Sequence, residues 1–222
     1  MIEVVLDTET TGLDPASGHR IVEIGCLELE NHLPTGRTYH QYINPERDMP
    51  AEAFAVHGLS EEFLASQPKF ADIAEKFMDF IGDSMLVIHN ADFDMGFINA
   101  ELTACDLDAI PRDRAVDTVA MARAKFPGAR ANLDALCQRF GIDNTDRELH
   151  GALKDARLLS DVYLELLGGR QRDLALKADS KAAATQQAER PYREPRSHAP
   201  SAEEEAAHGA FLAKIENNLW SE

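Results

Sequence analysis

The stretch IEVVLDTETTGL at residues 2–13 constrains the fold of this chain more than any other. Its apolar, β-branched opening over residues 2–6 predicts a buried strand. Asp7 and Glu9 follow at the carboxyl end and, being two residues apart, point to the same side. Two carboxylates held so close repel each other unless a cation lies between them. The stretch therefore predicts half of a divalent-metal site, although Asp7 and Thr8 would also serve simply to end a strand and open a turn.

Apolar periodicity places further elements along the chain. Strands are expected at residues 20–29, 37–43, 85–88 and 115–116. Helices are expected from Ser60, over 70–81, over 93–104, from the last strand to Pro127–Gly128, from Asn132 to Gly141, and over 151–167. The first three strands form a predicted antiparallel meander, and helices alternate with strands after it. This order predicts an α/β domain with a mixed sheet, whose site lies at the carboxyl ends of strands.

The chain changes character after this predicted domain, which spans residues 1–169. Residues 170–202 are expected to be a linker, because most of it is rich in Ala, Gln, Ser, Pro, Arg and Glu without an apolar period. Residues 203–222 predict an amphipathic helix, and its apolar face carries Phe211, Leu212, Ile215, Leu219 and Trp220. Such a helix on a flexible tail needs a groove on a partner, unless it folds back on its own domain.

Charge and composition narrow the classes of function. The 222 residues carry 39 acidic and 22 basic side chains and a net charge of −17, which argues against binding nucleic acid through a broad basic surface. From residue 169 on, 8 basic and 9 acidic side chains nearly balance, so the excess negative charge falls on the domain. The sequence contains no signal peptide and no apolar stretch of the roughly 20 residues that cross a bilayer. Three widely spaced cysteines predict reduced thiols in a cytoplasmic protein.

A second acidic motif, HNADFD at residues 89–94, follows a predicted strand and opens a predicted helix. One interpretation is that Asn90 or Asp92 merely caps that helix. The other is that Asp94, in the first helical turn, faces the carboxylates of the first strand. Phe93 would then be free to stack on a base or a sugar.

A third motif, HGALKDA at residues 150–156, stands at the start of the longest predicted helix. Five residues turn a helix by about 500°. His150 and Asp155 therefore meet only if His150 lies in the preceding loop. The alternative interpretation of this motif is a histidine that merely flanks the helix and an aspartate that is exposed to solvent.

The three motifs together supply four carboxylates and one histidine. Asp7, Glu9, Asp94 and Asp155 match the charge of two divalent cations, and their hard oxygen ligands favour Mg²⁺ or Mn²⁺. Two such ions roughly 4 Å apart activate a water and stabilise the leaving oxygen of a phosphoryl displacement. His150 suits the base that takes the proton from that water.

The motifs DTETTG, HNADFD and HGALKDA, with their surroundings over residues 2–169, resemble the DEDDh class of 3′→5′ exonucleases. Within that class the chain is similar to the epsilon proofreading subunits of bacterial DNA polymerase III. The resemblance implies a ribonuclease-H-like fold, with the four carboxylates as metal ligands and His150 as general base. It also implies that the 3′ nucleotide of the substrate packs near Thr11, Leu13, His57 and Phe93. Leu13 would act as a wedge at the terminal base, or would simply be a core leucine at the edge of a turn.

The resemblance extends into the tail. Residues 171–176, QRDLAL, are similar to a degenerate clamp-binding peptide through Gln171, Leu174 and Leu176, and imply the sliding clamp as a candidate partner. Such hexapeptides arise often by chance. The apolar face that ends in Leu219 and Trp220 implies binding to the polymerase alpha subunit. A flexible tether of this kind would keep the nuclease at a high effective concentration near a primer end.

The expected function is a proofreading 3′→5′ DNA exonuclease subunit that releases nucleoside 5′-monophosphates. It is expected in the bacterial cytoplasm, associated with the nucleoid during replication. Three alternatives remain: an RNA or short-oligonucleotide exonuclease, a non-catalytic subunit that stabilises the polymerase, and a phosphatase with Asp7 as nucleophile. The C-terminal segments argue against the first and the five catalytic side chains against the second. Glu9 at the position of the second aspartate of a DxDxT motif argues against the third.

Overall fold

The computed structural model describes residues 1–145, 150–169 and 199–215, in which five strands form one mixed sheet. The strands are β1 (Ile2–Thr10), β2 (Ile21–Glu30), β3 (Leu33–Tyr42), β4 (Met85–Ile88) and β5 (Ala115–Asp117). Their order across the sheet is β3-β2-β1-β4-β5. The first three are antiparallel neighbours, as predicted, and β4 and β5 run parallel to β1. The central position therefore belongs to the strand that carries the first acidic motif.

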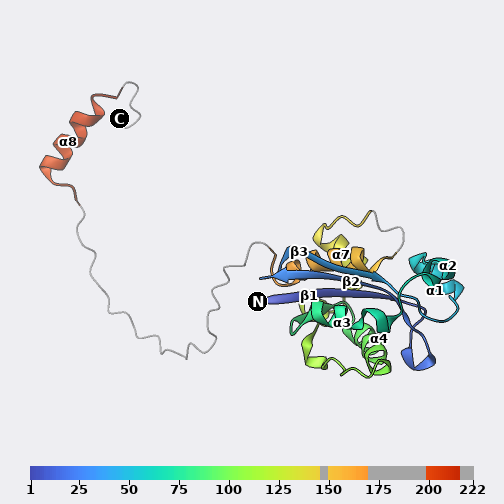
Figure 1. The fold of residues 1–222 in the computed structure, drawn as a ribbon. Helices are drawn as coiled ribbons and strands as arrows, with labels where there is room; N and C mark the ends of the chain where they lie inside the picture. The colour runs from blue at the N-terminus through green and yellow to red at the C-terminus, as the bar shows by residue number, and fades with distance from the viewer. Residues whose placement is uncertain (146–149, 170–198, 216–222) are drawn as a thin grey trace, which may run out of the picture. The chain divides into compact units, whose positions relative to one another are not determined.

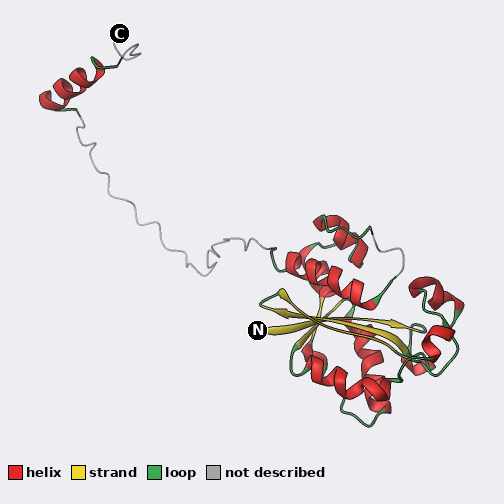
Figure 2. Ribbon diagram, turned by 45° about the horizontal axis from the view of Figure 1, so that its top comes forward, coloured by secondary structure: helices red, strands yellow, loops and turns green. Residues whose placement is uncertain are grey.

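Helices cover both faces of this sheet (Figures 1 and 2). The helices of the domain are α1 (Ala51–His57), α2 (Glu61–Ala65), α3 (Phe70–Ile81), α4 (Ala91–Ala104), α5 (Thr118–Lys125), α6 (Leu133–Phe140) and α7 (Ala152–Leu166). Alternate side chains of β1 enter two different cores. Val4 and Leu6 join the core with α3 and α4, and Val5 joins the core with α5, α6 and α7. Both faces of β1 are buried, which explains its nearly continuous apolar run.

Most predicted elements are present with small shifts at their ends. The strand at 85–88 and the helix at 70–81 have the predicted bounds. Ser60 and Asn132 cap their helices as predicted, because each side-chain oxygen accepts a hydrogen bond from a backbone N–H of the first turn. The α/β mixed sheet flanked by helices is thus confirmed.

Two of the strand predictions were wrong in extent. The first strand does not end at residue 6 but continues to Thr10, because β2 pairs with it along its whole length. Asp7 lies opposite Gly25 and Glu9 lies opposite Glu23 in that pairing. β3 also begins four residues earlier than predicted, at Leu33. Both metal-ligand candidates of this motif therefore belong to the sheet itself.

Two helices differ from the prediction. α4 begins at Ala91, two residues before the predicted start, and α1 was not predicted at all. The apolar side chains Phe54 and Val56 of α1 remain 45% and 46% exposed. Because α1 buries no apolar stripe, its sequence carries none of the helical periodicity that identifies a core helix.

The chain divides into two units, Met1–Leu174 and Ala175–Glu222, and each is described by itself. The second contains α8 (Ala202–Leu212), which Ser201 and Glu204 cap reciprocally. The predicted helix through residue 220 is wrong in one respect, since α8 ends at Leu212 and Ile215 lies in a turn. Hydrogen bonds between residues three apart tighten the chain there. Phe211 is 61% exposed, and the segment that holds Gln171, Leu174 and Leu176, like Leu219 and Trp220, lies outside the described residues.

Two further observations concern the described residues. The helices found there are too short or too polar to cross a membrane. Cys26, Cys105 and Cys137 are free thiols, and Cys26 and Cys137 are buried, as predicted.

One close approach positions the longest helix on the sheet. A Cβ atom built on Gly25 of β2 would lie 2.2 Å from the backbone nitrogen of Leu153, in the first turn of α7. No side chain fits between the two backbones, so only glycine lets α7 begin directly over β2. Asp7 is the partner of Gly25 in the β1–β2 pairing. The start of α7 therefore lies beside the first acidic motif.

Substitution of Gly25 tests this positioning. We expect Gly25→Ala to displace the first turn of α7, lowering the free energy of unfolding by about 1–3 kcal/mol and abolishing most activity. Gly96→Ala is the matched control, because Gly96 is an exposed residue of α4 with nothing within 4 Å of its added Cβ. The control should be neutral or more stable by up to about 1 kcal/mol. Denaturant unfolding and nuclease assays on both variants measure the two effects, and equal behaviour would contradict the role of Gly25.

Candidate active site

The site begins with the carboxylates of β1. Asp7 and Glu9 project from the face of the sheet that α7 covers, the same face as Val5. Glu9 is only 8% exposed and Asp7 is half-buried. The predicted arrangement of two carboxylates on one side of one strand is therefore present.

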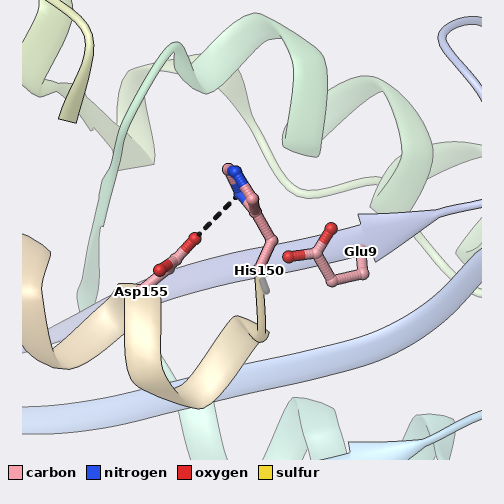
Figure 3. Close-up of side chains that lie close together, drawn as sticks. All are labelled: Glu9, His150 and Asp155. Atoms are coloured by element: carbon pink, nitrogen blue, oxygen red, sulfur yellow. Dashed lines mark ion pairs between the residues drawn. The ribbon is translucent and has the colours of Figure 1, made fainter. Parts of the chain in front are cut away.

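The third motif lies close to the first in the folded chain (Figure 3). Asp155 lies in the first turns of α7 and is buried, which removes the alternative of a solvated aspartate. His150 precedes the helix, and its Nδ1 lies 3.3 Å from Oδ2 of Asp155. One ligand atom each from Glu9, His150 and Asp155 lie within 4.8 Å of one another. Segments about 140 residues apart in the chain thus supply one cluster.

The backbone of His150 is held by the helix that the sequence did not predict. Its N–H donates to the carbonyl oxygen of Val56 in α1, at 3.1 Å. The side chain of His150 remains 45% exposed. The histidine is therefore anchored at its main chain and open to solvent at its ring, in the loop position that the spacing required.

The second motif reaches the same strand through Thr8. The N–H and hydroxyl of Thr8 both donate to Oδ1 of Asp94, at 3.1 and 2.7 Å. Thr8 stands between Asp7 and Glu9, so these bonds hold Asp94 against the segment of β1 that carries both. Of the two capping candidates, Asn90 does hold the N-cap position of α4, although without a side-chain bond, whereas Asp92 pairs with Arg112.

Burial dominates the electrostatics of Asp94. It raises the pKa of this carboxyl to about 7, although the hydrogen bonds from Thr8 act in the opposite direction. Buried carboxylates crowded in this way favour a bound cation, which would hold them in the ionised form. The oxygen-rich donor set of Asp7, Glu9, Asp94 and Asp155 fits a hard divalent metal. Divalent-metal dependence therefore follows from the chemistry of the site.

A cleft of about 570 Å³ opens beside Glu9. It contains all four residues predicted to lie near the 3′ nucleotide, which are Thr11, Leu13, His57 and Phe93. Leu13 is 85% exposed, so the alternative of a core leucine is wrong. We call this space the terminal cleft and define it by these four residues.

Two of these four side chains form hydrogen bonds within the protein, and the other two present apolar surface. The hydroxyl of Thr11 accepts a hydrogen bond from the N–H of Arg20 and so holds the turn after β1. Nδ1 of the buried His57 accepts from the N–H of Leu59, and burial lowers the pKa of His57. Leu13 and Phe93 instead offer apolar surface to the cleft.

Sequence reasoning missed Glu23. This buried carboxylate lies directly opposite Glu9 in the β1–β2 pairing, and Nε2 of His40 lies 2.6 Å from its Oε1. Glu23 therefore places a second carboxylate, hydrogen-bonded to His40, next to Glu9. One signal was available: a glutamate in the middle of a strand that otherwise reads as apolar.

Comparison with known proteins identifies the family. The Exonuclease family model matches residues 4–163. The DNA polymerase III subunit epsilon of Rickettsia conorii is 58% identical over 172 residues, which cover 76% of this chain and 75% of that protein. The chain belongs to the epsilon-subunit family of exonucleases. The epsilon subunit of Escherichia coli K12 is 48% identical over 175 residues, covering 75% of this chain and 72% of that protein.

Solved structures agree on the fold. Exonuclease X in complex with 5′ overhanging duplex DNA has a TM-score of 0.59 and 24% identity, covering 74% of this chain and 90% of that one. The nuclease domain of 3′hExo, a DEDDh family member bound to rAMP, has a TM-score of 0.65 and 20% identity, covering 75% of this chain and 91% of that one. The predicted ribonuclease-H-like fold of an epsilon-type exonuclease is thereby confirmed.

The raised pKa of Asp94 makes a prediction about pH. A folded state that holds a proton the unfolded state has lost becomes less stable as the pH rises. In EDTA, the free energy of unfolding of the wild type should therefore fall from about pH 4 to about pH 7, by on the order of a few kcal/mol. Asp94→Asn, which keeps an oxygen for Thr8, should lack this fall. Thermal unfolding between these pH values measures the difference.

The control for this experiment is Asp92→Asn. Asp92 lies two residues earlier on the same helix, with a side chain that is 81% exposed. This variant should follow the pH dependence of the wild type. A constant difference in stability between wild type and Asp94→Asn at all pH values would show that Asp94 ionises normally.

Proposed function

We propose that this chain is the proofreading 3′→5′ exonuclease subunit of a replicative DNA polymerase. The observation that carries the proposal is the cluster of Glu9, His150 and Asp155, in which Glu9 also lines the terminal cleft, in a chain of the epsilon-subunit family. The reaction is hydrolysis of the 3′-terminal phosphodiester, with release of a nucleoside 5′-monophosphate. A related protein of known structure binds duplex DNA with a 5′ overhang, which supports DNA as the substrate.

The metals are proposed to be two Mg²⁺ or Mn²⁺ ions. Asp7, Glu9, Asp94 and Asp155 would hold them. This assignment is supported by the burial of Glu9, Asp94 and Asp155 and by the closeness of Glu9 to Asp155. When bound, such ions make water more acidic and stabilise charge on the leaving oxygen. Thr8 contributes by keeping Asp94 in place through two hydrogen bonds.

The chain itself supplies the proton acceptor and the orientation of the substrate. His150, exposed at its ring and anchored at its N–H, is the proposed base that takes a proton from the attacking water. Leu13 and Phe93 present apolar surface on which the terminal base and sugar can pack. Only a nucleotide that has left its duplex fits between them, so a mismatched end should be cut faster.

The tail is proposed to deliver the substrate. The described helix α8 buries none of its side chains, and Phe211 and Ile215 are 61% and 39% exposed. These side chains, with Leu212, Leu219 and Trp220, are the proposed contact with the polymerase alpha subunit. Gln171, Leu174 and Leu176 are the proposed contact with the sliding clamp. Work at the replication fork implies the bacterial cytoplasm and association with the nucleoid.

Membership of the epsilon-subunit family weighs against the alternatives. A phosphatase that uses Asp7 as nucleophile would have a second aspartate two residues later, where this chain has Glu9. A purely structural subunit would have no need for His150 and Asp155 gathered beside Glu9. Cleavage of RNA oligomers at the rate of DNA oligomers would favour the remaining alternative.

The proposed reaction is tested with an end-labelled primer that carries a mismatched 3′ nucleotide. The wild type in Mg²⁺ should shorten it stepwise from the 3′ end, faster than a paired primer, and EDTA should stop the reaction. Asp7→Ala should lower the rate by at least about a thousandfold, yet still bind the polymerase. Asp48→Ala, at an 84% exposed carboxylate, is the control. Failure of the wild type in both Mg²⁺ and Mn²⁺ would leave only the structural subunit.

The role of His150 is tested by His150→Gln. Loss of a general base should lower kcat by roughly 10²- to 10⁴-fold with little change in KM. His208→Gln, at an exposed histidine of α8, should match the wild type. An unchanged kcat for His150→Gln would assign the base to another group.

A further inference from the structure

A second cleft lies beyond the carboxylates and has no part in the site described above. It has a volume of about 510 Å³, and it is lined by His89, Asn90, Val119, Arg123, Ala129, Arg130, Ala131 and Asn132. These residues come from the end of β4, from α5, and from the loop that leads into α6. We call this space the basic cleft.

The basic cleft begins next to the metal-ligand candidates. β4 runs parallel to β1 and ends at Ile88, which lies opposite Leu6, so His89 begins the turn next to the part of β1 that leads into Asp7. Asn90 lines the basic cleft, whereas Phe93, one helical turn further along α4, lines the terminal cleft. Asp94 follows directly. The terminal cleft is lined by the end of β1 and the turn after it, and the basic cleft by residues that follow β4 and by α5, which follows β5. Because β4 lies between β1 and β5 in the sheet, the two clefts follow neighbouring strand ends along one edge.

The charge of this cleft is opposite to that of the domain. Arg123 and Arg130 are both exposed, and neither guanidinium forms an ion pair or hydrogen bond with another described residue. Oδ1 of Asp117 accepts hydrogen bonds from the N–H groups of Asn90 and Val119, and within the described residues this carboxylate forms no ion pair with either arginine. Two uncompensated guanidinium groups on a chain of net charge −17 form a local site for an anion.

Polar donors complete the lining. Asn90 and Asn132 carry side-chain amides, and they stand at the N-cap positions of α4 and α6. Ala129 and Ala131 contribute only small side chains to the lining. The lining thus offers cationic and amide donors and little apolar surface for a base to stack on.

We propose that the basic cleft binds the sugar-phosphate backbone of the DNA strand on the 5′ side of the scissile bond. The proposal rests on the proposed function. The terminal nucleotide occupies the terminal cleft, its phosphodiester lies at the carboxylates, and the next phosphates contact Arg123 and Arg130. Contacts to phosphate carry no sequence information, as suits an enzyme that must remove any terminal base.

This path has a consequence for substrate length. A substrate that ends at the scissile bond uses only the terminal cleft and the carboxylates. Each added nucleotide that reaches Arg123 or Arg130 adds binding energy, which falls as salt concentration rises. Arg123 and Arg130 are thus predicted to determine how strongly cleavage improves with strand length.

The experiment compares two substrate types on the full chain. The p-nitrophenyl ester of thymidine 5′-monophosphate has no upstream phosphate, whereas oligothymidylates of increasing length do. Arg123→Gln, Arg130→Gln and the double variant should hydrolyse the ester at the wild-type rate. On long oligothymidylates each substitution should lower kcat/KM roughly three- to tenfold, mainly through KM, with a shallower dependence on salt. Arg123→Lys and Arg130→Lys should retain most of the wild-type rate.

Lys76→Gln is the matched control, because Lys76 is an exposed cation on α3, on the other face of the sheet. It should leave both substrates unaffected. Equal cleavage of long oligothymidylates by the wild type and the double variant would overturn the proposal, as would an equal loss on the ester. Failure of the wild type to cleave either substrate would instead reject the proposed function.

Discussion

The close packing of α7 on β2 at Gly25 is the contact on which the rest of the site depends. Two backbones meet there without an intervening side chain, and Asp7 is the β1 residue opposite that point. The first turns of α7 carry Asp155, and the loop before them carries His150. A helix held farther from the sheet by even one methyl group would carry both side chains away from Glu9. The accuracy of the site thus comes from a packing contact and not from a bond between catalytic groups.

The second constraint is electrostatic. Glu9, Asp94 and Asp155 are all buried at one end of the sheet, and Glu23 adds a fourth buried carboxylate beside Glu9. Like charges in a medium that solvates them poorly oppose folding. The chain offsets part of this through the bonds from Thr8 to Asp94 and from His40 to Glu23. Bound cations would offset the remaining repulsion between these carboxylates. A domain with so much negative charge can then accept a phosphodiester.

Sequence patterns predicted most of the fold and the identity of the candidate ligands, for physical reasons that are easy to trace. β1 is buried on both faces and α3 on one, so their apolar patterns are strong. α1 buries almost none of its apolar side chains and was missed, although its Val56 carbonyl holds His150. The start of α4 was placed two residues late, although Asn90, which the sequence offered as a cap, does occupy its N-cap position.

The sequence by itself determined which residues could do the chemistry: an acidic pair with period two on a strand, and an aspartate and a histidine at helix starts. These follow from local geometry, which residues near one another in the chain dictate. Only the tertiary structure decided which groups meet. Glu23 lies opposite Glu9 because of strand pairing, and Leu13 is exposed because of the turn after β1. Arg123 and Arg130 share a cleft because a helix and a loop converge there. Contacts of this kind depend on packing between distant segments, which no local pattern records.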